Sequence, residues 1–206
     1  MDPGPNDVLL VVDVQHDFLP GGSLAVPDGD AVIPVINRLG QRFRHVVLTQ
    51  DWHPAGHMSF AAGYPGRAPF DMIDVVYGSQ MLWPTHCVQG THGAELSPVL
   101  DLPHAELVVR KGFRPDVDSY SAFKEADRVT PSGLAGYLRE RGFTRVFLTG
   151  LALDVCVAWS AIDARAAGFT AVMLDDACRA IDAHGSLARA ERMMSEAGVQ
   201  RGLSEG

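Results

Sequence analysis

The sequence predicts a three-layer αβα sandwich built around a mostly parallel β-sheet. Five short runs of apolar and β-branched residues alternate with amphipathic stretches of helical spacing, which is the pattern of repeated βαβ units. These runs are apolar nearly throughout, as expected for strands that helices cover on both faces. The 206 residues and the 47% hydrophobic content suit one domain spanning residues 1–206.

The expected strands are Val8–Val14, His45–Gln50, Leu107–Lys111, Arg145–Thr149 and Ala171–Leu174. The expected helices are Asp30–Arg44, Pro131–Arg141, Asp154–Ala167 and His184–Ala197. We expect Thr130 to be the N-cap of the second helix, with Pro131 at its first position. Gly142, Gly168 and Gly198 follow three of the helices and are suited to end them.

The segment Asp51–Gly93 interrupts this alternation. It is rich in Pro, Gly, Trp and His and has little periodicity. A loop of this length in a compact domain is usually functional. We therefore interpret it as the wall of a binding site.

The charge and the cysteines limit the class of protein. A formal net charge of −8 without any basic run disfavours nucleic acid as a partner. The three cysteines form no CxxC pair, which argues against a secreted disulfide scaffold. No secretory signal and no run of ~20 apolar residues are evident. These features favour a cytoplasmic protein that does not bind membranes.

Chemically active residues gather at the predicted strand ends. Asp13 and Lys111 each close an apolar run, Asp51 follows another, and Cys156 begins a helix just after the strand that ends at Thr149. Ligands of parallel α/β sheets bind beyond the carboxyl ends of the strands. A carboxylate, an ammonium and a thiol at one sheet edge can generate a nucleophile.

Each of these residues also has a structural interpretation. Cys156 is equally well explained as a core cysteine, although the N–H groups of a helix start would favour its thiolate. Asp13 would then be a cap or a loop hydrogen-bonding partner, and Lys111 a solvated strand end. Arg110 fits that last interpretation better than Lys111 does.

The histidines of the aperiodic segment suggest a metal site. Asp51 and His53 are two residues apart after a strand and so share one side of the chain. Such ligands suit Zn²⁺, Fe²⁺ or Mn²⁺. His86 is the first candidate for a third ligand, followed by His57 and His92, and we interpret the remaining histidines as surface or loop residues: His16, His45, His104 and His184. Trp52, Phe60 and Trp83 add aromatic walls for a small flat ligand or pack in the core.

The motifs occur in the order of a known family. The run Val12–Phe18 resembles the start of the isochorismatase-like cysteine hydrolases. Two further runs, Thr49–Pro54 and Trp83–Thr91, resemble the nicotinamidase branch of that family. The match continues through Lys111–Gly112, Asp118–Phe123 and Gly150–Cys156, and it covers the chain from about Asp7 to about Ala180.

The resemblance implies a catalytic triad of Asp13, Lys111 and Cys156. It implies an oxyanion hole formed by the backbone N–H groups of Ala152 and Cys156, next to a cis peptide between Leu151 and Ala152. The implied activity is the hydrolysis of nicotinamide to nicotinate and ammonia through a cysteine thioester.

The resemblance also implies a metal that orients the pyridine ring. The implied ligands are Asp51, His53 and His86, with Zn²⁺ as the first expectation and Fe²⁺ or Mn²⁺ as alternatives. His57 is an additional candidate ligand, because family members differ there. The substrate pocket is implied to be lined by Phe18, Trp83, Tyr120 and Phe123.

The family's Rossmann-like sheet has six parallel strands, and the weakly apolar segment 199–203 is the candidate for the sixth. The expected partner is a small molecule, nicotinamide or pyrazinamide, and a homo-oligomer is left open. Three alternatives remain: another hydrolase of the family (an isochorismatase or a carbamoyl-amide hydrolase), a catalytically silent binding protein on this fold, and a zinc hydrolase whose metal activates water.

Overall fold

A six-stranded, fully parallel sheet forms the centre of the protein, as predicted. The computed structural model describes residues 2–205. The strand order is β5-β2-β1-β6-β7-β8, and every neighbouring pair is parallel. The strands are β1 (Asp7–Val12), β2 (Val46–Asp51), β5 (Leu107–Lys111), β6 (Arg145–Leu151), β7 (Thr170–Arg179) and β8 (Gln200–Gly202).

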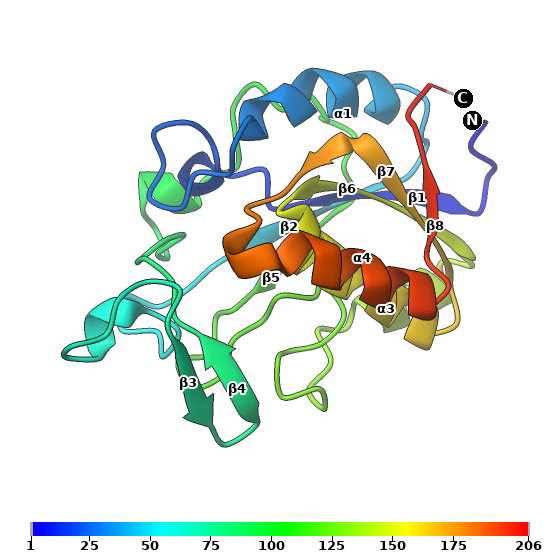
Figure 1. Ribbon diagram of the computed structural model, residues 1–206. Coiled ribbons are helices and arrows are strands. Elements are labelled where there is room, and N and C mark those ends of the chain that lie inside the picture. Colours follow the sequence, from blue (N-terminus) through cyan, green and yellow to red (C-terminus); the bar gives the residue numbers. More distant parts are fainter. Residues whose placement is uncertain (1, 206) are drawn as a thin grey trace.

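Helices cover both faces of this sheet (Figure 1). They are α1 (Val32–Gly40), α2 (Leu134–Glu140), α3 (Ala158–Ala166) and α4 (Ser186–Glu196). Helix α1 packs on one face with an apolar cluster that includes Leu9 and Val11. The other three helices pack on the opposite face, in a cluster that includes Leu10 and Val12. Successive residues of β1 thus enter opposite cores, which explains why the strand is apolar throughout.

The sixth strand is formed by β8, at the edge of the sheet. It pairs with β7, with Val172 opposite Gln200 and Leu174 opposite Gly202. The guanidinium of Arg201 lies 2.9 Å from Asp175 and 2.8 Å from Glu191. Backbone pairing and these ion pairs hold the strand, which is why its apolar signal in the sequence is weak.

The predicted start of the second helix is wrong. Helix α2 begins at Leu134, after Gly133 in a left-handed conformation with φ 95°. Pro131 instead forms an isolated bridge with Lys124, and the hydroxyl of Thr130 donates to Asp127 at 2.6 Å. The preference of Thr for Asx-type turns competes here with its capping preference.

The aperiodic segment contains one element that we did not predict. Strands β3 (Met72–Val75) and β4 (Gly78–Met81) form an antiparallel hairpin that projects from the domain beside α3 and α4 (Figure 1). Its only buried side chain in β4 is Gln80, so the apolar alternation that usually marks a strand is missing.

The order of the strands fixes where a ligand can bind. The chain runs from β1 outward to β2 and β5, and later places β6, β7 and β8 on the other side of β1. The carboxyl ends of β1 and β6 therefore flank a topological switch point, where parallel sheets open a crevice. No helix within residues 2–205 is long and apolar enough to cross a membrane.

Gly150 of β6 lies against the backbone of Val12 in β1. Its φ is +109°, and a Cβ at this position would lie 2.1 Å from the carbonyl oxygen of Val12. We expect Gly150→Ala to lower the free energy of unfolding by at least ~2 kcal/mol, because such a backbone conformation costs a side chain ~1–3 kcal/mol before any overlap. Urea denaturation followed by circular dichroism measures the change.

The matched control is Gly136→Ala, in the interior of α2. A Cβ there meets no atom within 4 Å, and alanine is favoured over glycine in a helix by roughly 0.5–1 kcal/mol. The control should be neutral or stabilising. Equal stabilities of the two variants would contradict the steric argument.

Candidate active site

Four strand ends bring the predicted residues to one cavity. Asp13 follows β1, and Asp51 and Lys111 are the last residues of the neighbouring strands β2 and β5, where they pair in register. Cys156 follows β6 in the turn Leu153–Val157, which leads into α3. All four residues are buried. The convergence at the sheet edge that we expected from the sequence is present.

Lys111 joins these residues through its ammonium group. Its Nζ lies 2.7 Å from Asp13 Oδ2, 2.8 Å from Asp51 Oδ1 and 3.5 Å from Cys156 Sγ, and it also donates to the carbonyl of Ser119. Burial disfavours the charged amine, but attraction to Asp13 and Asp51 raises the pKa of Lys111 well above its usual value. The side chain is therefore a buried cation shared by two carboxylates.

Asp13 is fully buried, and both of its carboxylate oxygens have a close polar neighbour. Its Oδ1 accepts a hydrogen bond of 2.6 Å from the hydroxyl of Thr49. Its Oδ2 lies 2.7 Å from the ammonium of Lys111. Burial raises the pKa of Asp13, against the attraction of Lys111. A buried carboxylate of this kind is a candidate proton acceptor.

Burial raises the pKa of the Cys156 thiol well above the usual range, the charge of Lys111 opposes this, and Asp13 and Asp51 add to it. The influence of the helix start on the thiol, which we expected from the sequence, stays a prediction. A thiol whose pKa is raised needs a proton acceptor close by to act as a nucleophile.

The three predicted metal ligands form a buried cluster. One ligand atom each from Asp51, His53 and His86 lies within 4.8 Å of the other two. The Nε2 atoms of His53 and His86 are 3.1 and 3.5 Å from Asp51 Oδ2. Burial raises the pKa of Asp51, but His53 and Lys111 outweigh this and hold it well below its usual range. Asp51 is thus ionised, as a ligand must be.

The outer nitrogens of both histidines are held by backbone carbonyls. Nδ1 of His53 lies 2.9 Å from the Gly112 oxygen, and Nδ1 of His86 lies 2.7 Å from the Pro84 oxygen. A carbonyl partner requires the proton on Nδ1, which leaves the Nε2 lone pair directed at the cluster. The residues present fit a divalent metal of the zinc type.

The two further candidate metal ligands from the sequence, His57 and His92, do not direct a free ring nitrogen at this cluster. His57 packs its ring 4.2 Å from that of His53, and its own nitrogens meet the Ser59 hydroxyl and the Val117 carbonyl. His57 also belongs to a second buried group, with His53 and Asp118. His92 lies on the surface, where it contacts Glu95.

Sequence reasoning missed two glutamines that position the site. Gln15 is buried, donates to the Asp51 carbonyl and accepts from the Asp51 amide, both at 2.8 Å. Gln80 reaches in from the hairpin and donates to Asp118 at 2.7 Å and to the Tyr120 hydroxyl at 2.8 Å. Because Gln15 lies within the motif Val12–Phe18, its position in the sequence could have indicated a role in the site. The hairpin residues around Gln80 are mostly exposed, so nothing in the sequence indicated that Gln80 is buried there.

The cavity between the thiol and the histidines is narrow and aromatic. Phe18, Trp83 and Tyr120 line it together with Cys156 and the metal-ligand cluster. Phe123, which we also expected here, lies in the apolar core beside Phe169 instead. Phe60 packs edge-on against His53. Segment 119–123 has no periodicity, so the sequence could not indicate which of its aromatic rings faces the cavity.

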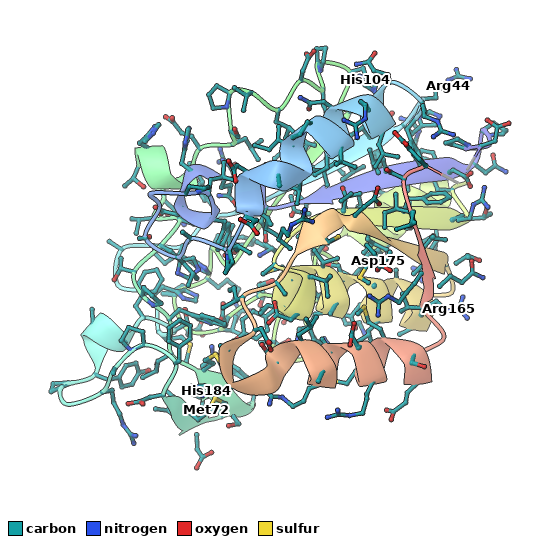
Figure 2. The ribbon with its side chains drawn as sticks, turned by 45° about the horizontal axis from the view of Figure 1, so that its top comes forward. Arg44, Met72, His104, Arg165, Asp175 and His184 are labelled. Carbon is teal, nitrogen blue, oxygen red and sulfur yellow. The ribbon has the colours of Figure 1, made fainter. Side chains whose placement is uncertain are left out.

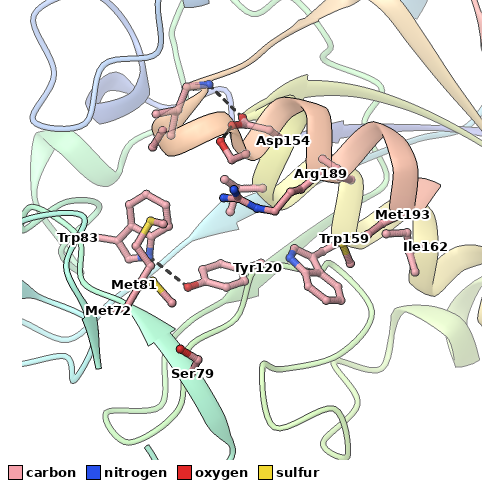
Figure 3. A pocket seen from close by; sticks show the side chains of 16 residues that line it. Met72, Ser79, Met81, Trp83, Tyr120, Asp154, Trp159, Ile162, Arg189 and Met193 are labelled. Atoms are coloured by element: carbon pink, nitrogen blue, oxygen red, sulfur yellow. Dashed lines mark hydrogen bonds between the residues drawn. The ribbon is translucent and has the colours of Figure 1, made fainter. Parts of the chain in front are cut away.

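A larger groove adjoins the cavity and shares Trp83 and Tyr120 with it. Figure 3 shows these rings opposite Trp159 and Arg189, and the Trp83 indole donates to the Tyr120 hydroxyl. Met72 of the hairpin lies across from the start of α4, near His184 (Figure 2). The groove leads from the cavity to the surface.

The predicted oxyanion residues lie beside the thiol. The peptide between Leu151 and Ala152 is cis. The Ala152 carbonyl accepts hydrogen bonds from Val155 and Val157, which sets the turn that carries Cys156. The role of the Ala152 and Cys156 N–H groups as an oxyanion hole stays a prediction.

Comparison with known proteins identifies relatives along nearly the whole chain. Residues 7–202 match the Isochorismatase domain. The chain is 57% identical over 201 residues to a nicotinamidase of Acinetobacter baylyi, which covers 98% of this chain and 94% of the relative. A solved nicotinamidase/pyrazinamidase from Acinetobacter baumanii superposes with a TM-score of 0.96 at 55% identity, covering 98% and 97% of the two chains. The pyrazinamidase of Pyrococcus horikoshii, solved in complex with zinc, has a TM-score of 0.78 at 36% identity, covering 97% and 99%.

Gly112 is required for the metal-ligand cluster. A Cβ on Gly112 would lie 2.4 Å from Cε1 of His53, and its φ is +65°. We expect Gly112→Ala to displace the His53 ring and to reduce the metal content of the purified protein at least tenfold, as loss of an outer-shell partner does. Elemental analysis by mass spectrometry measures the content.

Gly66→Ala serves as the control for this variant. Gly66 has a similar φ of +81°, but a Cβ there meets no atom within 4 Å. The control carries the same backbone strain without the collision, so it should keep its metal. Full metal content in Gly112→Ala would show that the His53 ring tolerates the added atom.

Proposed function

The chain belongs to the isochorismatase family, and on that premise we propose that it is the amidohydrolase that converts nicotinamide to nicotinate and ammonia. It is a hydrolase that acts on a linear amide C–N bond. The observation that carries the proposal is that the thiol of Cys156 and the metal-ligand cluster line the same cavity. A pyridine ring with an amide substituent offers its ring nitrogen to the cluster and its carbonyl carbon to the thiol.

Cys156 acts as the nucleophile in this proposal. As Sγ bonds to the amide carbon, the thiol proton moves to the Asp13 carboxylate, which shares the Lys111 ammonium with the sulfur. The carbonyl electrons move to the oxygen, which the Ala152 and Cys156 N–H groups hold. Each such donor is worth roughly 2.7–4 kcal/mol in the transition state. The tetrahedral intermediate then collapses, the C–N bond breaks, and Asp13 gives its proton to the leaving ammonia.

Water completes the cycle at the thioester. Asp13, ionised again, takes a proton from the water as its oxygen attacks the thioester carbon. The C–S bond breaks as the carbonyl re-forms, and Asp13 returns its proton to the sulfur. The acid product leaves and releases its own proton to solvent to give nicotinate. Lys111 positions this exchange, because its ammonium contacts both the proton acceptor and the sulfur and opposes the effect of burial on each.

The aromatic residues and the metal ligands orient the ring. Phe18, Trp83 and Tyr120 line the cavity, and the hydrogen bond from the Trp83 indole to the Tyr120 hydroxyl fixes two of them. A divalent cation held by Asp51, His53 and His86, which we assign as zinc, would supply a Lewis-acid contact to the pyridine nitrogen. We assign His57 to the support of His53 because both of its nitrogens are engaged.

This orientation also suits pyrazinamide, which carries a ring nitrogen in the same relation to its amide. Nicotinate is the form in which the pyridine ring returns to the salvage of NAD. The competing assignments of isochorismatase and carbamoyl-amide hydrolase would leave the buried Asp51 cluster without a role. A zinc hydrolase that activates water would leave the contact between Lys111 and Cys156 without one.

Substitution of the nucleophile tests the covalent step. We expect Cys156→Ala to reduce ammonia release from nicotinamide by roughly 10⁴–10⁶-fold, as removal of a nucleophile does elsewhere, with metal content unchanged. A coupled ammonia assay measures the rate.

Cys178→Ala is the matched control, since Cys178 is also a buried free cysteine but lies on β7. It should remain active. Comparable activity of the two variants would end the thioester proposal.

The role of the metal ligands predicts a change in selectivity as well as in rate. The wild-type protein should prefer nicotinamide over benzamide, which lacks the ring nitrogen, by a ratio of kcat/KM on the order of 10⁴, as expected for a site built to bind one polar group. In His53→Ala that ratio should fall towards one. Parallel assays with both amides measure it.

His45→Ala, a histidine paired with Glu106 away from the cavity, should keep the wild-type ratio. If His53→Ala loses rate equally for both amides and keeps its selectivity, the metal-ligand cluster does not recognise the ring nitrogen.

A further inference from the structure

We propose that His16, His92 and Glu95 form a second site for a divalent transition metal, outside the catalytic cavity. One ligand atom from each of the three lies within 4.8 Å of the other two. His92 Nδ1 is 3.0 Å from Glu95 Oε2, and the His16 and His92 rings stack with centroids 3.9 Å apart. The distance between His92 and Glu95 is comparable to the distances of 3.1 and 3.5 Å from the two histidines to Asp51 in the buried cluster.

The backbone holds the three residues in place. His16 begins the 3₁₀ turn His16–Phe18 (η1), and His92 begins the 3₁₀ turn His92–Ala94 (η4), and the two turns lie side by side (Figure 1). The His16 amide donates to the Glu95 carbonyl at 3.1 Å, and the Glu95 amide donates to the His92 carbonyl at 3.1 Å. Only side-chain rotation remains for the ligands to close on an ion, so the site is largely pre-organised.

The ligand set selects the ion. Two imidazoles and a carboxylate suit Zn²⁺ or another late first-row divalent metal and are poor ligands for Mg²⁺ or Ca²⁺. The side chains of His92 and Glu95 are 75% and 64% exposed. An ion held there would keep water ligands and bind more weakly than in the buried cluster.

The position of the site gives it a structural role. Gln15 and Asp17 flank His16 on the chain. Gln15 pairs with the backbone of Asp51, and Asp17 Oδ2 accepts a 2.7 Å hydrogen bond from the amide of Cys87, the residue after His86. A metal that joins η1 to η4 would therefore clamp the backbone that carries two of the catalytic ligands.

Zinc titration of the untagged, full-length protein tests the proposal. After chelation and removal of bound metal, isothermal titration with zinc chloride should show two binding events per wild-type chain, the weaker of which is lost in His92→Ala and in Glu95→Gln. The control His104→Ala should keep both events, because His104 lies near the far end of α1 (Figure 2), bound to the Phe43 carbonyl. A single event in the wild type, or two in His92→Ala, overturns the proposal.

A second pair of variants isolates the surface site. His53→Ala should retain one zinc per chain, and the double variant His53→Ala/His92→Ala should retain none. Because an ion that binds only the folded state stabilises it, zinc should raise the Tm of His53→Ala but not that of the double variant. An equal rise in both would place the second ion elsewhere. These readouts do not depend on nicotinamide hydrolysis.

Discussion

The ammonium of Lys111, buried between two carboxylates, is the interaction on which the site depends. Burying one charge alone costs several kcal/mol, and two neighbouring carboxylates without a cation would repel each other. Lys111 stabilises Asp13 and Asp51 at once, with contacts of 2.7 and 2.8 Å. This arrangement requires that β5, β2 and β1 be adjacent and end at the same level, which the parallel register provides. The sheet topology is thus the precondition of the charge cluster.

The same topology separates the two chemical functions of the cavity. The strands on one side of β1 carry Asp51 and Lys111, and β6 on the other side carries the turn with Cys156. Asp13 follows β1 between these two groups of strands, and Lys111 contacts Asp13, Asp51 and Cys156. The aperiodic segment 51–93 then closes the cavity from outside, because Gln80 anchors the hairpin to Asp118 and Tyr120. A long loop without its own core is held here by buried polar contacts.

The sequence predicted those parts of the structure that rest on local patterns. A charged residue that closes an apolar run marks a strand end, so Asp13, Asp51 and Lys111 and five of the six strands were predictable. Contacts that arise only in three dimensions were not. The hydrogen bonds of Gln15 and Gln80, the inward turn of Phe123 to the core and the start of α2 at Leu134 depend on neighbours distant in the chain. The effect of burial on the pKa of the Cys156 thiol likewise depends on the folded surroundings and not on the local sequence.

Asp51 couples the metal-ligand cluster to the nucleophile. Its Oδ2 faces the two histidines, while its Oδ1 contacts the ammonium of Lys111. A divalent cation held by this cluster would add positive charge beside Asp51. The negative charge of Asp51 is one of the influences that raise the pKa of the Cys156 thiol. One carboxylate therefore contacts both the histidines of the metal-ligand cluster and the ammonium that lies 3.5 Å from the Cys156 sulfur.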